Sequence, residues 1–176
     1  MIIGYRNVVK HKADAYNAAK TLVWFPASTV QLGDLVYLST GPRDWPLDDW
    51  FCVVGARIDA FMKTPKVWIP EYDDCGDPVW GTEDEEIDSY IRRLGFNPRK
   101  SIRMSEVAAV EEVTQLGLPK ELLNSEGGGL DISAWCTDDE EKLPQEEVDW
   151  KSWDIAEDVL DWDEWITFPD EDERRD

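Results

Sequence analysis

The chain has 176 residues, with 18 lysines and arginines against 39 aspartates and glutamates, which gives a formal net charge of −21. Hydrophobic residues make up 42% of the sequence and aromatic residues 11%, enough to bury a core, so a wholly disordered chain is excluded. The charge excludes ordinary nucleic-acid binding through a basic face and disfavours anionic membranes, and it favours basic partners.

Membrane insertion and secretion are also disfavoured. No run of apolar residues is long enough for a transmembrane helix, and the start of the chain, MIIGYRNVVKHK, does not resemble a signal peptide. Cys52, Cys75 and Cys136 are odd in number and widely spaced, which predicts neither a disulfide framework nor a CxxC metal site. We therefore expect a cytoplasmic protein, located in the host cytoplasm if it is viral.

The first 70 residues predict a small antiparallel sheet or partly open barrel within an α+β fold. Short apolar runs alternate there with turns rich in glycine, proline and aspartate. The Ala-rich stretch 11–20 is typical of a helix. Strands are expected over 1–10, 21–25, 35–40, 50–62 and 66–70.

Two helices are expected in the central part of the chain. The segment 83–94 has apolar residues at i, i+3, i+4 and i+7, acidic residues in its first turn and Gly95 after its last turn. The segment 105–116 has an apolar residue at nearly every third position, and Pro119 follows it. A short strand is expected over 130–135.

The three glycines that begin at Gly127 indicate a joint between two parts of the chain. Residues 131–176 carry 4 basic and 19 acidic side chains, so most of the excess charge lies after this joint. The expected organisation is a compact α+β body over 1–126, a joint at 127–130, an acidic, tryptophan-rich segment over 131–168 packed on the body, and a disordered tail over 169–176.

The last predicted element is an acidic amphipathic helix over 146–164. From Val148 onwards one face of this segment carries apolar residues at helical spacing, and Pro144 and Pro169 flank it. The segment contains nine acidic residues and one lysine. On a helix with a rise of about 1.5 Å per residue, this is roughly one net charge per 3.5 Å. Phosphates along one strand of duplex DNA are spaced by about 3.4 Å.

This charge density predicts a nucleic-acid mimic. We expect a non-enzymatic inhibitor that occupies the basic site of a nuclease or another nucleic-acid-processing protein, as anti-restriction, anti-CRISPR and immunity proteins do. The expected contact residues are Glu146, Glu147, Asp149, Trp153, Asp154, Glu157, Asp158, Asp161, Asp163 and Glu164. A secondary acidic patch is expected at Asp73, Asp74, Asp77, Glu83, Asp84 and Glu85.

Catalytic motifs are absent from the sequence. His11 is the single histidine, and the chain contains neither a phosphate-binding loop nor a dinucleotide-binding fingerprint. No cofactor, no metal and no direct contact with nucleic acid or membrane is therefore expected. Two alternatives stay open: a ligand-binding module in the N-terminal sheet, with the acidic C-terminus only improving solubility, and a metal-dependent hydrolase that uses Asp73, Asp74 and Asp77.

Overall fold

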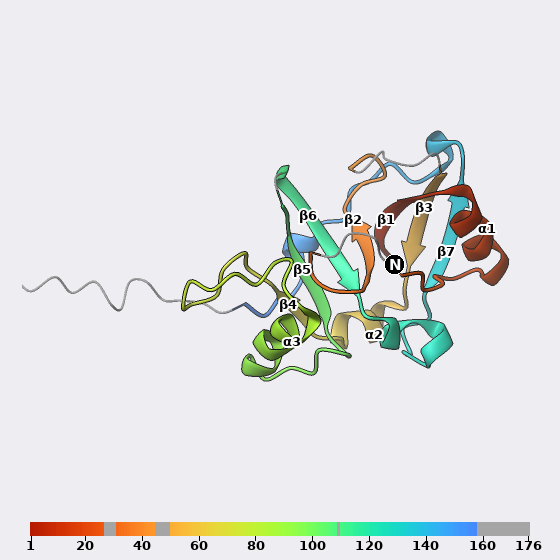
Figure 1. Ribbon diagram of the computed structural model, residues 1–176. Coiled ribbons are helices and arrows are strands. Elements are labelled where there is room, and N and C mark those ends of the chain that lie inside the picture. The colour runs from red at the N-terminus through yellow and green to blue at the C-terminus, as the bar shows by residue number, and fades with distance from the viewer. Residues whose placement is uncertain (27–30, 45–49, 109, 158–176) are drawn as a thin grey trace, which may run out of the picture.

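A computed structural model describes residues 1–26, 31–44, 50–108 and 110–157 (Figure 1). Its strands are β1 (Ile2–Val8), β2 (Val36–Ser39), β3 (Trp50–Gly55), β4 (Lys66–Trp68), β5 (Ile102–Val107), β6 (Val110–Leu118) and β7 (Ser133–Thr137). Its helices are α1 (Lys10–Ala19), α2 (Ile58–Lys63) and α3 (Asp84–Arg93). Single 3-10 turns are η1 (Lys120–Leu122), η2 (Asn124–Glu126), η3 (Glu140–Lys142) and η4 (Trp150–Ser152).

The seven strands form one open sheet in the order β4-β5-β6-β2-β1-β3-β7. Neighbouring strands are antiparallel except for β4 and β5, which are parallel. The mixed α+β fold is thus confirmed, but the sheet is not closed into a barrel. It also extends beyond the first 70 residues, because β5, β6 and β7 come from later parts of the chain.

The two faces of the sheet are covered by different elements. Side chains alternate between faces along a strand, so Ile102 and Met104 of β5 enter the larger core while Arg103 points to the other face. There the buried guanidinium of Arg103 contacts Asp88 of α3 at 2.6 Å. A smaller core lies beneath α3, formed by Leu32, Leu35, Val67, Ile69, Val79, Ile87, Tyr90 and Ile91.

The helix α1 lies beside β7, at the opposite end of the sheet from α3 (Figure 1). The side-chain amide of Asn17 donates to the carbonyl oxygen of Cys136 at 2.9 Å, and its oxygen accepts from the N–H of Cys136 at 2.8 Å. The N–H of Ala134 donates to the carbonyl oxygen of Lys20 at 3.3 Å. The outer edge of β7 is therefore capped, which prevents it from pairing with another strand.

Cys52 and Cys136 form a disulfide between β3 and β7, which corrects the expectation that the cysteines stay unpaired. The two residues lie directly opposite each other, and their Cα atoms are 4.0 Å apart. The backbone of Cys136 bonds outwards to Asn17, as expected for the closely spaced, non-hydrogen-bonded pairs of an antiparallel ladder. Because the two cysteines are 84 residues apart, the sequence contains no local signal of this pairing.

The predicted helix over 105–116 is wrong, since β5 and β6 occupy this stretch. Its valines recur about every third residue, but valine and threonine favour strands, and alternation of residues such as Leu116 and Leu118 matches a period of two. The helices expected over 11–20 and 83–94 are confirmed by α1 and α3.

Two predicted strands also differ from the structure. Residues 21–25 form no strand: α1 ends at Lys20, whose φ is 55°, and Leu22 then packs in the larger core without joining the sheet. The strand expected over 50–62 ends at Gly55, and α2 takes up its second half. Up to that point Cys52 and Val54 are buried and Phe51 and Val53 are partly exposed, as expected for a strand with one face on the core.

The glycine-rich stretch is a tight turn packed against η1. Gly127 and Gly129 have positive φ angles of 74° and 76°. A side chain at Gly128 would collide with the backbone of Leu122. After this turn the chain enters β7, so the residues expected to follow a joint belong to the same sheet as β1 and β3.

We expect the Asn17→Ala substitution to lower the free energy of unfolding by about 2–3 kcal/mol, because it removes two hydrogen bonds and leaves the backbone groups of Cys136 unsatisfied. Chemical denaturation measures this effect. Asp14→Asn, on the exposed face of the same helix, is the control and should change stability by less than about 0.5 kcal/mol. Equal stabilities of the two variants would contradict the capping role of Asn17.

Candidate functional site

The acidic segment that follows β7 is fixed to the sheet by hydrogen bonds to several strands. The Tyr5 hydroxyl donates to the carbonyl oxygen of Glu146 at 2.8 Å, and the N–H of Val148 donates to the carbonyl oxygen of Thr40 at 3.0 Å. Further along, Ala156 exchanges two hydrogen bonds of 2.8 Å with Lys66 and Trp68 of β4. We call residues 143–157 the acidic strap.

Two tryptophans anchor the strap in the larger core. Trp150 is 3% exposed, and its indole Nε1 donates to the carbonyl oxygen of Ile3 at 2.9 Å. Trp153 is 9% exposed and packs edge-on against Phe61, with ring centroids 5.1 Å apart. Trp153 therefore cannot act as the exposed partner-binding residue that the sequence suggested, because its side chain stabilises the fold instead.

A buried lysine lies beneath this aromatic pair. The ammonium of Lys66 is 4.7 Å from the centroid of the Phe61 ring and 5.7 Å from that of Trp153, and it donates to the carbonyl oxygens of Phe61 and Thr64. Burial lowers the pKa of Lys66, and the negative charge of Asp154 acts in the opposite direction. Lys66 thus links the strap to the end of α2 and to β4.

The predicted C-terminal helix is absent from its described half. Residues 146–157 contain the 3-10 turn η4, and the flanking residues are irregular. The backbone N–H and carbonyl oxygen of Ala156 bond to Lys66 and Trp68 of β4, whereas an α-helix would use both groups in its own hydrogen bonds. The remaining part of the predicted helix, with Asp158, Asp161, Asp163 and Glu164, lies outside the described residues.

The carboxylates of the strap point to solvent. Glu146, Glu147, Asp149, Asp154 and Glu157 are all exposed. None of them forms an ion pair within the described part of the chain. The strap therefore presents carboxylates on an ordered backbone, and of these only Asp154 is shown to interact electrostatically with a cation of the described residues, the ammonium of Lys66.

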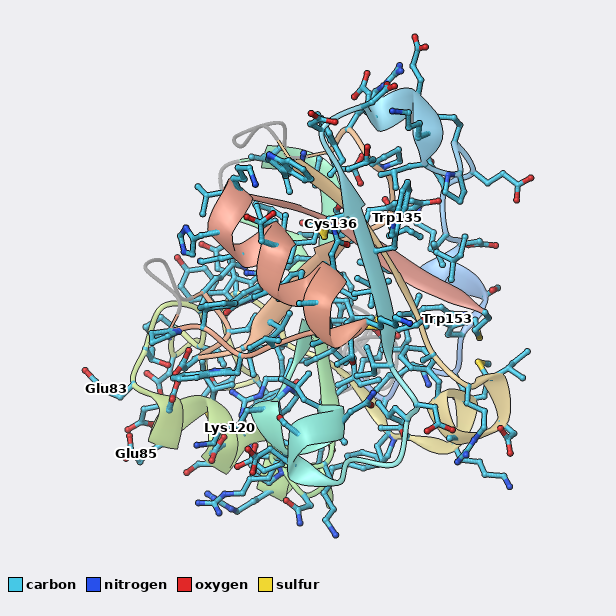
Figure 2. The ribbon with its side chains drawn as sticks, turned by 90° about the vertical axis from the view of Figure 1, so that its right-hand side faces the viewer. Glu83, Glu85, Lys120, Trp135, Cys136 and Trp153 are labelled. Carbon is cyan, nitrogen blue, oxygen red and sulfur yellow. A yellow bond between two sulfur atoms is a disulfide. The ribbon has the colours of Figure 1, made fainter. Side chains whose placement is uncertain are left out.

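The secondary acidic patch expected from the sequence is divided between the two ends of α3. Glu83 and Glu85 project outwards at the start of the helix (Figure 2). Asp84 is also exposed, but its carboxylate lies beside Gly33. Asp73 and Asp74 lie instead beside Arg93 in its last turn, at 3.2 and 3.5 Å. Since a helix of this length spans about 15 Å, the two groups form separate surfaces.

The carboxylate of Asp73 is bonded to groups of its own loop and of α3. One carboxylate oxygen of Asp73 accepts from the backbone N–H groups of Cys75 and Asp77, and the other contacts Arg93. The hydrogen bond from Asp77, followed by the contacts with Arg93 and Cys75, lowers the pKa of Asp73. Asp73, Asp74 and Cys75 could converge on a cation, but the Arg93 guanidinium already contacts both carboxylates.

A groove of about 820 Å³ lies between the start of the chain and the β3–β7 edge of the sheet. Trp135 of β7 lines it and is 47% exposed, on the opposite side of β7 from α1 (Figure 2). Arg57 and Lys20 also line the groove, and Arg57 is paired with Asp131 at 2.8 Å. Sequence reasoning missed this groove because its walls come from segments far apart in the chain.

Comparison with known families places the chain in one of them. A family model matches residues 30–158, and the chain belongs to this family, which is described as a family of unknown function (DUF5910). Neither the curated proteins nor the solved structures contain a match. Within the described residues, no helix has the length and hydrophobicity needed to cross a bilayer.

We expect Trp153→Ala to lower the free energy of unfolding by about 3–5 kcal/mol, the usual effect of deleting a buried aromatic side chain. Trp135→Ala is the matched control, and because Trp135 is half exposed we expect a loss of less than about 1 kcal/mol. Urea denaturation measures the free energy of unfolding of both variants. A similar loss for the two variants would show that the strap is not anchored through Trp153.

We expect Arg93→Gln to raise the pKa of Asp73 part of the way towards its ordinary value, because the donors on Asp77 and Cys75 remain. Carbon NMR of the side-chain carboxyl groups measures this shift. The folded-state pKa lies below the unfolded value, so the stabilisation from these contacts is complete above the unfolded pKa and is lost as the pH falls through the folded one. An unchanged pKa of Asp73 in this variant would show that Arg93 does not lower it.

Proposed function

We propose that the protein is a non-enzymatic inhibitor that uses its acidic strap to bind a basic surface on a nuclease or another nucleic-acid-processing protein. The observation that supports this proposal is the set of exposed, unpaired carboxylates on a backbone anchored to the sheet. Elsewhere in the described residues, Asp73 and Asp88 contact arginines of the same chain. Within the described residues the carboxylates of the strap form no ion pair with an arginine, and Glu146, Glu147, Asp149 and Glu157 are exposed to an external cation.

The density of carboxylates on the strap supports nucleic-acid mimicry. Glu146, Glu147 and Asp149 fall within four consecutive residues and are all exposed. The strap therefore concentrates negative charge over a short length of chain, as a phosphate backbone does. A groove built to hold a phosphate backbone would offer lysines and arginines at suitable intervals, and association would be rapid and salt-sensitive.

An ordered strap also favours binding energetically. A disordered acidic tail would lose conformational entropy on binding, whereas the strap is already held by Tyr5, Trp150 and Trp153. We therefore assign Glu146, Glu147, Asp149, Asp154 and Glu157 as the described part of the proposed contact surface. The proposed contact surface also includes four acidic residues that follow in the sequence, Asp158, Asp161, Asp163 and Glu164.

A second candidate function is supported by the groove at Trp135. A half-exposed tryptophan in an open, largely apolar groove is a common feature of binding sites for peptides or small molecules. This corresponds to a ligand-binding module in which the strap only improves solubility. Trp135→Ala separates the two functions, because it would abolish ligand binding at the groove and leave binding through the strap unchanged.

We expect the combined substitutions Glu146→Gln, Glu147→Gln and Asp149→Asn to weaken binding to the basic partner by at least tenfold, about 1.4 kcal/mol, and to reduce its salt dependence. The partner is first captured with the natural protein at low salt and released at high salt. Its affinity for each variant is then measured by calorimetry. Duplex DNA is added as a competitor, and it should displace the inhibitor.

Glu83→Gln, Asp84→Asn and Glu85→Gln form the matched control, since they remove the same number of charges from the start of α3. Circular dichroism and melting temperature confirm that both triple variants remain folded. Equal affinities for the natural protein and the strap variant would contradict the proposal. Loss of affinity in the α3 variant alone would assign the contact surface to α3.

A further inference from the structure

The disulfide between Cys52 and Cys136 is enclosed by the folded protein. The two residues are 0% and 3% exposed. The helix α1 packs over this part of β3 and β7, and the amide of Asn17 is bonded to both backbone groups of Cys136. A dissolved thiol or disulfide therefore cannot reach either sulfur atom while α1 is docked on the sheet.

The bond joins an edge strand to the interior of the sheet. β7 is the last strand of the sheet, and β3 is its partner there. The bond closes a loop of 84 residues that contains α2, β4, α3, β5 and β6. The chain leaves β7 through η3 and enters the acidic strap, so the position of β7 determines where the strap begins.

We infer that the Cys52–Cys136 bond forms before α1 docks on the sheet, and that the protein matures in an oxidising compartment. In reducing compartments stable disulfides are rare, whereas they persist in secreted proteins and in the lumen of the secretory pathway. This inference differs from the cytoplasmic location expected from the sequence, which rested on unpaired cysteines and on a start of the chain that does not resemble a signal peptide. It stands independently of the proposed inhibitory function.

The oxidation is a thiol–disulfide exchange with a small disulfide such as oxidised glutathione. The thiolate of one cysteine attacks the glutathione disulfide, forms a mixed disulfide and releases one glutathione thiolate. The thiolate of the second cysteine then displaces the other glutathione and closes the bond between Cys52 and Cys136. The protein loses two thiol protons and two electrons, and one glutathione disulfide becomes two glutathione thiols.

In the folded protein the third cysteine is poorly suited to attack the Cys52–Cys136 bond. Cys75 is exposed, and the negative charges of Asp74 and Asp73 raise the pKa of its thiol. A smaller thiolate fraction slows its attack on a disulfide. The pairing of Cys52 with Cys136 is therefore protected from rearrangement by Cys75.

The first experiment counts free thiols in the full chain after production in the bacterial periplasm. The protein is purified without reductant, unfolded in urea with a maleimide reagent and weighed by mass spectrometry. We expect one adduct, on Cys75, before reduction and three adducts after it. The Cys75→Ser variant should show none before reduction and two after it. Three adducts on the natural chain before reduction would overturn the inference.

The second experiment measures how fast dithiothreitol reduces the bond. We expect reduction to be at least about a hundredfold slower in native buffer than in urea, because the sulfurs become accessible only after local opening of α1. Asn17→Ala should accelerate native reduction, since it weakens the contact between α1 and β7. Equal rates in native buffer and in urea would contradict the enclosed position of the bond.

The double substitution Cys52→Ala with Cys136→Ala should lower the melting temperature by roughly 5–15 °C, the effect expected for a disulfide that closes a long loop in a domain of this size. Cys75→Ser is the control and should melt within about 2 °C of the natural protein. If the double variant does not fold, the thiol count on the natural chain still decides the inference. Equal melting temperatures would overturn the role of the bond in stabilising the fold.

Discussion

The anchoring of the acidic strap to the sheet is the interaction on which the proposed site depends. Like charges four residues apart on a helix repel by a few tenths of a kcal/mol per pair, so a segment this acidic gains little from its own local contacts. Burial of Trp150 and Trp153 contributes a much larger stabilisation than this repulsion costs. About 150–250 Å² of buried aromatic surface at about 25 cal/mol per Å² gives roughly 4–6 kcal/mol for each side chain. The tryptophans therefore determine the course of the strap, and the carboxylates occupy solvent-facing positions before Trp150 and after Trp153.

Sequence patterns predicted the elements whose signal is local. The apolar stripe of α3, the Ala-rich α1 and the short strands β1 to β4 all depend on neighbouring residues, and the structure has them at or near the expected positions. The helix expected over 105–116 failed because a spacing of three between valines fits a helix, whereas the β-branched side chains and the alternation at Leu116 and Leu118 fit a strand. Residues 146–157 are not α-helical for another reason, since the backbone of Ala156 is bonded to β4, which no local pattern reveals, and the rest of the helix predicted over 146–164 lies outside the described residues.

The sequence predicts which kind of residue forms the candidate site, but not how these residues are arranged in space. The concentration of acidic residues after Gly129 was visible in the composition, and the exposure of Glu146, Glu147 and Asp149 agrees with a role at the surface. What the sequence could not show is which carboxylates are neutralised by arginines of the same chain. Asp73 and Arg93 are 20 residues apart, and their contact depends on how the loop before α3 folds back on the helix. The division of the acidic residues into paired and unpaired groups, which supports the proposed function, is thus a property of the tertiary structure.

The capped edge and the disulfide together fix the start of the strap. β7 is held on one side by its ladder and the covalent bond to β3, and on the other side by Asn17 and the carbonyl oxygen of Lys20. An edge strand bound on both sides does not exchange its pairing, so the residues after Thr137 leave the sheet from a defined position. Such preorganisation reduces the entropy lost when a partner binds. If the protein matures in an oxidising compartment, its basic partner must be present there too, and the same bond that protects the fold would then also maintain the geometry of the binding surface.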